Sequence, residues 1–136
     1  MPKGRADVMS VDYSMPVLVV DDYQTVLRIM RSLLRRAGFV EVDTAGDGEE
    51  ALAKMRERKY GLVITDWYMA PVNGLELVKQ ARADEALKET PIILVSGEGS
   101  PENLKAANDA GASGYVLKPF DSQTLKAKIE TVLSAA

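Results

Sequence analysis

The chain has 136 residues, of which 46% are hydrophobic and 27% charged, and its net charge is −3 at pH 7. This size and composition are typical of one soluble globular domain, and the charge argues against a generally basic surface for nucleic acid or membrane lipid. Because the sequence has neither Cys nor His, it excludes disulfides, thiolate or imidazole metal sites, a cysteine nucleophile and an internal phosphohistidine.

The first segment, residues 1–14, is polar and lacks the apolar core of a signal peptide. It predicts a flexible tail ahead of one domain at residues 15–136. No apolar run approaches the length of a membrane-spanning helix, and the missing cysteines suit a reducing compartment. We therefore expect a cytoplasmic protein that makes no membrane contact.

From Met15 onward, short β-rich runs alternate with longer helical patterns about five times. The first run, VLVV at 17–20, is wholly apolar, as a strand buried on both faces should be. Further strands are expected at 39–45, 60–65, 91–95 and 114–117. Helices are expected at 23–37, 47–58, 74–83, from Ser100 to Gly111, and after Asp121.

Alternating strands and helices predict a parallel sheet that is covered by helices on both faces. Ligands of such sheets bind at the carboxyl ends of the strands, where the strand order reverses. In the order 2-1-3-4-5, which is taken from known five-stranded sheets, the reversal lies between strands one and three. Those two strands end in Asp21 and Asp22 and in Asp66.

These three carboxylates indicate a Mg²⁺ pocket. Like charges at one sheet edge raise the pKa values of the group and are destabilising unless a cation joins them. Mg²⁺ prefers oxygen ligands and a phosphate, and a carboxylate can attack phosphorus to form an aspartyl phosphate. Alone, Asp22 suits a helix N-cap and Asp66 a turn, but their joint placement favours a metal site with Asp66 as nucleophile.

Two further strand ends carry complementary groups. Ser96 follows PIILV and offers a hydroxyl, and Lys118 follows GYVL and offers a compact positive charge. Lys118 can pair with Asp66 before reaction and with a phosphate afterwards. Either residue alone suits a simpler role, as a turn hydroxyl or a solvated surface charge.

The motifs VLVVDD, LVITDW, NG at 73–74, LVSGE and GASGYVLKPF occur in this order. With them the chain resembles the receiver domain of bacterial response regulators, the CheY-like family, from about Pro16 to Leu133. The resemblance implies a doubly wound, flavodoxin- or CheY-like α/β fold, with a five-stranded parallel sheet in the order 2-1-3-4-5 and five helices. It also implies a cis peptide bond before Pro119.

The resemblance also assigns roles to particular residues. Asp66 would be the phosphoacceptor, and Mg²⁺ would be bound by Asp21, Asp22, Asp66 and the backbone carbonyl of Tyr68. Ser96 would be the switch hydroxyl, Tyr115 the switch aromatic and Lys118 the active-site lysine. By itself, Tyr115 suits a half-buried core aromatic with its hydroxyl in water.

By this resemblance we expect a stand-alone response regulator of a two-component phosphorelay, because no output module follows the receiver pattern. A sensor histidine kinase or phosphotransfer protein would phosphorylate Asp66 in a Mg²⁺-dependent reaction. The changed surface of the fourth helix, fifth strand and fifth helix would signal to a separate target protein, with no direct nucleic-acid contact. The protein would assist its own phosphorylation and dephosphorylation only, as a monomer or weak dimer. Both chemotaxis and stress signalling use such domains.

The sequence departs from the family pattern in the loop after Asp66. Many members have proline directly after the residue matching Met69, whereas this chain has Ala70 there and Pro71 one position later. Tyr68 stands where a smaller polar residue is common. We predict that Tyr68 and Glu98 flank the path of the hydrolytic water and set the phosphate lifetime.

Three other functions compete with this expectation. A Mg²⁺-dependent phosphatase acting through an aspartyl phosphate would need an acid in the place of Tyr68. A receiver-like interaction domain that is never phosphorylated would be expected to lack an acid, the hydroxyl or the lysine, and none is missing. A flavin or nucleotide site would need a Gly-rich loop after the first strand, where DDYQTV stands instead.

Overall fold

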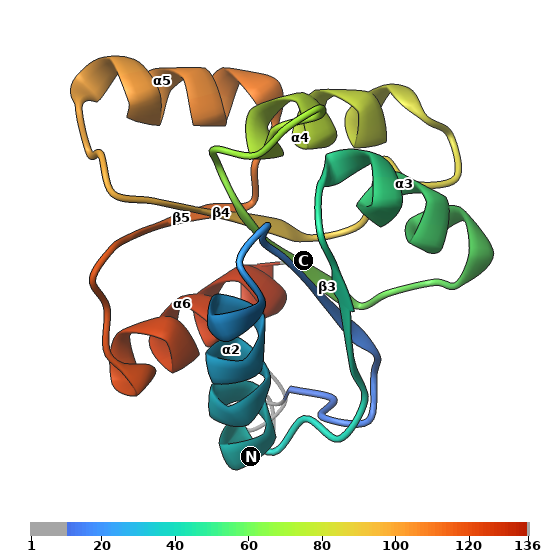
Figure 1. Ribbon diagram of the computed structural model, residues 1–136, viewed down its shortest axis with the longest axis vertical. Helices are drawn as coiled ribbons and strands as arrows, with labels where there is room; N and C mark the ends of the chain where they lie inside the picture. The colour runs from blue at the N-terminus through green and yellow to red at the C-terminus, as the bar shows by residue number, and fades with distance from the viewer. Residues whose placement is uncertain (1–10, 136) are drawn as a thin grey trace, which may run out of the picture.

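The computed structural model describes residues 11–135, over which strands and helices alternate regularly (Figure 1). The elements are β1 (Val17–Val20), α2 (Gln24–Ala37), β2 (Val42–Ala45), α3 (Gly48–Glu57), β3 (Leu62–Asp66), α4 (Gly74–Ala83), β4 (Ile92–Ser96), α5 (Pro101–Ala110), β5 (Gly114–Leu117) and α6 (Ser122–Ala135).

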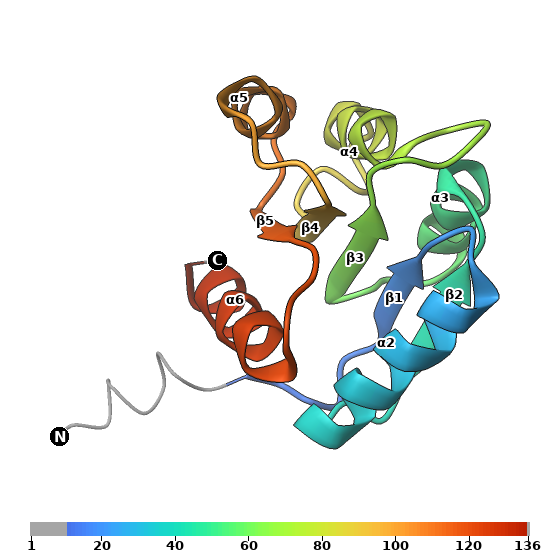
Figure 2. The same ribbon diagram turned by 60° about the vertical axis from the view of Figure 1, so that its left-hand side comes forward.

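The five strands form one parallel sheet in the order β2-β1-β3-β4-β5. Helices α3, α4 and α5 cover one face of this sheet, and α2 and α6 cover the other (Figure 2). The predicted doubly wound α/β fold and its strand order are therefore confirmed. Val20, the last residue of β1, pairs with Thr65 of β3, so the two acidic strand ends lie side by side.

Each face of the sheet contributes to a separate hydrophobic core. In β1, Leu18 and Val20 point into the cluster under α3, α4 and α5, whereas Val17 and Val19 point into the cluster under α2 and α6. All four side chains are buried, which explains why this strand is apolar throughout. Burying one such side chain contributes about 1.5–3 kcal/mol.

The helix ends follow the capping signals in the sequence. The Ser100 hydroxyl accepts the backbone N–H of Asn103 at 3.1 Å, and the Asp121 carboxylate accepts that of Thr124 at 2.8 Å. Gly111 ends α5 in the left-handed conformation with φ 98°, which an L side chain rarely adopts. These caps fix where α5 and α6 begin relative to the strands before them.

Three strands have other bounds than predicted: those expected at 39–45, 60–65 and 91–95 lie at Val42–Ala45, Leu62–Asp66 and Ile92–Ser96. The strand expected at 39–45 begins at Val42, because the chain first turns back so that the N–H of Phe39 reaches the Leu34 carbonyl at 3.0 Å. β3 and β4 each end one residue later than expected. Asp66 and Ser96 are therefore the last residues of their strands rather than the first residues of the following loops.

Part of the segment expected to be a tail packs against the domain. The ring of Tyr13 lies 4.8 Å from that of Phe39, and Val11 also contacts the core under α2 and α6. Residues 1–10 lie outside the described part of the chain, so their flexibility stays a prediction. Among residues 11–135, the helices are too short or too polar to cross a membrane.

Candidate functional site

Three carboxylates meet at the carboxyl ends of β1 and β3, as predicted. Asp21, Asp22 and Asp66 each offer an oxygen, and these oxygens all lie within 4.8 Å of one another. The simpler role considered for Asp22 is wrong, because the N-cap of α2 is Tyr23. Since oxygen donors from two strand ends converge here, the residues fit a hard divalent cation such as Mg²⁺.

Asp21 is the buried member of this group, with 3% of its surface exposed. Burial raises the pKa of its carboxyl, the hydrogen bond that it accepts from the Tyr23 N–H at 2.9 Å lowers it, and the charge of Asp66 raises it again. The net shift is upward, which means that this position disfavours the carboxylate. A bound cation would reverse that preference.

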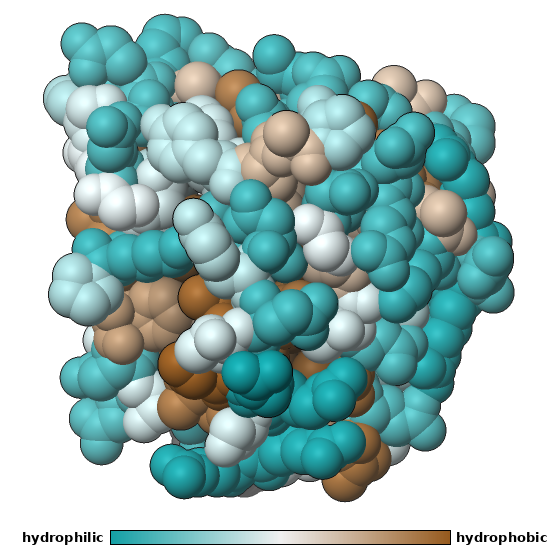
Figure 3. All heavy atoms as spheres, viewed as in Figure 1, coloured by the Kyte–Doolittle hydropathy of each residue, from teal (hydrophilic) through white to brown (hydrophobic). Residues whose placement is uncertain are grey.

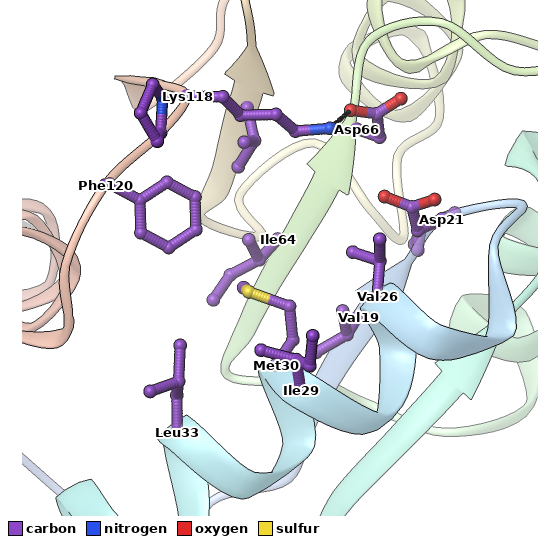
Figure 4. Close-up of a pocket in the computed structure, with 13 residues that line it drawn as sticks. Val19, Asp21, Val26, Ile29, Met30, Leu33, Ile64, Asp66, Lys118 and Phe120 are labelled. Atoms are coloured by element: carbon purple, nitrogen blue, oxygen red, sulfur yellow. Dashed lines mark ion pairs between the residues drawn. The ribbon is translucent and has the colours of Figure 1, made fainter.

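Lys118 reaches the same pocket from the end of β5. Its Nζ lies 2.7 Å from Oδ1 of Asp66, and Figure 4 shows this ion pair above Asp21. The backbone N–H of Lys118 donates to the Ser96 carbonyl at 2.8 Å, which ties the ends of β4 and β5 together. The Lys118–Pro119 bond is cis, as the resemblance implied.

Ser96 ends β4 and is buried, with 1% of its surface exposed. Its neighbour in the strand, Val95, pairs with Asp66, so the Ser96 hydroxyl lies one residue further along the adjacent strand. Ser96 Oγ accepts the N–H of Glu98 at 3.1 Å. The hydroxyl therefore holds the start of the β4–α5 loop in this structure.

Three aromatic rings pack together next to that loop. Trp67 is buried and stacks on Tyr68, with ring centroids 6.0 Å apart, and Tyr115 meets Trp67 edge-on at 5.9 Å. The Tyr68 hydroxyl donates to the Glu98 carboxylate at 3.2 Å, and the Tyr115 hydroxyl donates to the Glu98 carbonyl. The two residues predicted to set phosphate lifetime thus contact each other directly.

Two glycines shape the loop that carries Tyr68, a role that was not predicted for them from the sequence. The Gly74 N–H donates to the Trp67 carbonyl at 2.8 Å, and a Cβ on Gly74 would lie 2.2 Å from the Asp66 carbonyl oxygen. A Cβ on Gly48 would lie 2.6 Å from the Val72 carbonyl oxygen. The pairs Asn73–Gly74 and Asp47–Gly48 are the features of the sequence that could have predicted this role. Ala70–Pro71, in the same loop, is a cis bond.

An apolar groove that the sequence did not predict opens beside the acidic pocket. It has a volume of about 480 Å³ and runs from Asp21, Asp66 and Lys118 down between α2 and the segment before α6 (Figure 4). Val26, Ile29 and Leu33 of α2 line it, so part of the apolar stripe of this helix borders the groove, although Val26 and Leu33 also pack against the core. Figure 3 shows this region as apolar surface among polar surroundings.

Comparisons with known proteins agree with this geometry. Residues 17–130 match the family model described as response regulator receiver domain. The chain is 40% identical over 119 residues to chemotaxis protein CheY-3 of Vibrio cholerae, covering 88% of this chain and 92% of that protein. It is 41% identical over 118 residues to chemotaxis protein CheY of Pseudomonas aeruginosa, covering 87% and 95%. The structure of the chemotaxis response regulator CheY4 of Vibrio cholerae superposes with a TM-score of 0.81 at 37% identity, covering 88% and 98%.

Proposed function

The chain belongs to the response regulator receiver domain family, and on that premise we propose that Asp66 is the residue that becomes phosphorylated. The observation that carries the proposal is the ion pair of Lys118 with Asp66, at 2.7 Å, beside two further carboxylates. A nucleophilic carboxylate, a cation to balance it and oxygen ligands for a metal then lie in one pocket.

We propose that Asp21, Asp22 and Asp66, with the backbone carbonyl of Tyr68, hold one Mg²⁺ ion. When bound, the metal supplies positive charge that balances the phosphoryl oxygens against the carboxylates. The raised pKa of Asp21 supports this assignment, because an acid at a buried position gains most from a cationic neighbour.

Phosphoryl transfer would begin with attack of an Asp66 carboxylate oxygen on the phosphorus of a phosphohistidine. The P–O bond forms, the P–N bond breaks, and the imidazole of the sensor kinase or phosphotransfer protein takes up a proton as it leaves. Lys118 would move from Asp66 Oδ1 to a phosphoryl oxygen, where it balances the added charge. The protein thereby assists only its own phosphorylation and dephosphorylation.

The signal would leave the site through Ser96 and Tyr115. Ser96 Oγ, which accepts the Glu98 N–H at 3.1 Å, would turn its own proton toward the phosphoryl group. Tyr115 would follow into the space that is vacated and change the surface made by α5, β5 and α6. Leu104 and Leu117 are exposed on these elements and offer apolar contact to a separate target protein.

We propose that the protein acts as a stand-alone cytoplasmic regulator of motility. The chain matches the two chemotaxis proteins over nearly their whole length. Because both are named for chemotaxis, we propose the control of motility as the process. A sensor histidine kinase or phosphotransfer protein and a target protein are the partners that this function requires.

Labelled phosphate transfer tests the function. A histidine kinase carrying labelled phosphate should label the wild type but not the Asp66→Asn variant, and a magnesium chelator should stop the transfer. Equal labelling of both proteins would remove Asp66 from its role. Multiple turnover of small phosphate esters would instead support a phosphatase.

A second experiment tests the residues that flank the phosphate. Tyr68 and Glu98 contact each other beside Asp66, so the double change Tyr68→Asn with Glu98→Ala should open the approach of water and speed loss of the phosphate. An unchanged dephosphorylation rate would contradict this role.

A further inference from the structure

Hydrogen bonds reach every polar group of Glu98. Its N–H donates to Ser96 Oγ at 3.1 Å, and its carbonyl accepts the Tyr115 hydroxyl. Its carboxylate oxygen Oε1 accepts two donors, the Tyr68 hydroxyl at 3.2 Å and the Asn103 side-chain amide at 3.1 Å. Glu98 is therefore the point at which the loop after β3, the strand β5 and the helix α5 are joined.

The backbone of Glu98 is held by its own two hydrogen bonds, whereas its side chain extends from a segment with little packing on its N-terminal side. Gly97 and Gly99 flank it, and a Cβ placed on Gly97 would meet nothing within 4 Å. Since glycine gives the backbone its widest conformational freedom, the position of the carboxylate depends on its hydrogen-bond partners.

Asn103 is the more firmly held of the two donors. It lies in the first turn of α5, half-buried, and its backbone N–H is capped by Ser100 Oγ at 3.1 Å. Tyr68, by contrast, has 55% of its surface exposed and sits in the loop after Asp66. The amide of Asn103 can thus hold the Glu98 carboxylate where the Tyr68 hydroxyl reaches it.

We propose that Asn103 is a positioning residue for hydrolysis of phosphorylated Asp66. It touches neither phosphate nor metal, and it acts by holding Glu98 against Tyr68, which closes one side of the approach to Asp66. Water then reaches the phosphoryl group more slowly than it would past a loose Glu98. This inference rests on the proposed function and deepens it, because it names the residue on α5 that sets phosphate lifetime.

The test measures the rate constant for loss of labelled phosphate from the full chain. The protein is phosphorylated with a labelled acyl phosphate and Mg²⁺, and the donor is then removed. Asn103→Ala should raise the rate constant about threefold, the size expected when one exposed hydrogen bond is lost. Asn103→Gln retains an amide donor and should lie nearer the wild type. Asn108→Ala, a change on an exposed position of the same helix, should have no effect.

A double-mutant cycle decides whether Asn103 acts through Glu98. In a Glu98→Ala background, Asn103→Ala should cause no further acceleration, because the group that Asn103 holds is gone. A rate constant for Asn103→Ala equal to wild type, or the same acceleration with and without Glu98, would overturn the proposal.

Two further measurements keep the outcome clear. If Asn103→Ala lowers the melting temperature enough to obscure the rate, Tyr68→Phe removes only the second donor to the Glu98 carboxylate, the Tyr68 hydroxyl, and should accelerate hydrolysis in the same way. An unchanged rate in Tyr68→Phe would also overturn the proposal. Labelling of Asp66→Asn would contradict the proposed function, whereas labelled Asp66 with an unaltered lifetime in Asn103→Ala contradicts only the role of Asn103.

Discussion

At the scale of single residues, Asp21 is a position where the proposed metal site requires a carboxylate but burial in the fold disfavours its charge. Its carboxylate lies at the end of a fully buried strand, within reach of two other acids. The hydrogen bond that it accepts from the Tyr23 N–H does not offset the desolvation of its charge, since the net shift of its pKa is upward. An acid whose charge is disfavoured in the metal-free protein is accounted for if the site binds a cation, as proposed above.

Replacing Asp21 should therefore separate stability from metal binding. Asp21→Asn keeps an oxygen that can accept the Tyr23 N–H but removes a buried charge beside Asp66. Without Mg²⁺, we expect the free energy of unfolding to rise by about 1 kcal/mol, because a buried carboxylate beside two other acids is replaced by a neutral side chain. Mg²⁺ affinity should fall at the same time. Urea unfolding with and without Mg²⁺ measures both, and a variant less stable than wild type without metal would contradict the argument.

At the scale of secondary structure elements, Arg82 joins α4 to the ends of its neighbours. Its Nε donates to the Gly111 carbonyl at 2.9 Å, and its guanidinium also reaches the Thr90 carbonyl at 2.8 Å and Ser113 Oγ at 3.2 Å. Burial lowers the pKa of Arg82, which means that desolvation disfavours its charged form. The hydrogen bonds to these acceptors stabilise the charge. One side chain thus fixes the end of α5 and the starts of β4 and β5.

We predict that Arg82→Met lowers the free energy of unfolding by about 2–3 kcal/mol, because partly buried carbonyls lose a charged donor. Lys79→Met, on an exposed position of the same helix, is the matched control and should change stability by less than about 0.5 kcal/mol. Urea denaturation measures both variants. Equal stability of the two would mean that the Arg82 hydrogen bonds contribute nothing net.

A second contact between elements gives a pH dependence. The Tyr60 hydroxyl, just before β3, donates to Asp43 of β2 at 2.6 Å, and Arg58 donates to the same carboxylate at 2.9 Å. Burial, and then the bond to Asp43, raises the pKa of Tyr60 to about 12. A pKa that is higher in the folded than in the unfolded chain means that the folded state retains this proton.

The pH range of the effect follows from the sign of that shift. The stabilisation is fully present below about pH 10, the ordinary tyrosine value, and is lost as the pH rises toward the folded value. Tyr60→Phe cannot lose this proton, so its stability should fall less steeply than that of the wild type above about pH 10. Urea unfolding at a series of alkaline pH values checks this, and parallel curves for the two proteins would refute it.

At the scale of the whole molecule, the sequence predicts most of the fold because local and long-range signals agree. The apolar run at 17–20 is buried on both faces, Ser100 and Asp121 cap the helices expected after them, and the strand-end acids converge. What the sequence does not reveal depends on contacts between distant segments. The bond from Asn103 to Glu98 crosses a loop whose path no local pattern dictates.

The apolar groove illustrates the same limit. Val26, Ile29 and Leu33 have the spacing of a core-facing stripe, and nothing in that spacing shows that α2 turns part of it toward an open groove. Likewise, Tyr13 packs on Phe39 although the polar composition of its neighbours predicts a tail. Periodicity assigns a residue to a face of a helix, but the position of the helix decides what that face meets.

Magnesium should stabilise the molecule as a whole, because the ligands proposed for it come together only when β1 and β3 are paired. Asp21 and Asp66 are far apart in the sequence and meet at one sheet edge, so the unfolded chain offers no comparable site. A ligand that binds only the folded state adds RT ln(1 + [L]/Kd), which is about 1.4 kcal/mol at roughly ten times Kd. The melting temperature should therefore rise with Mg²⁺ concentration.

Trp67 provides a second readout of the same event. It follows Asp66 directly and is buried between Tyr68 and Tyr115, so a charge bound at Asp66 changes the field around its ring. We expect its fluorescence to change with Mg²⁺ along the same saturation curve as the melting temperature. Sodium chloride at equal ionic strength controls for screening, and Asp21→Asn controls for the site. One binding equilibrium governs both readouts, so they should change together. If sodium chloride raises the melting temperature as much as Mg²⁺ does and the fluorescence stays constant, then ionic screening, and not a bound ion, stabilises the acids.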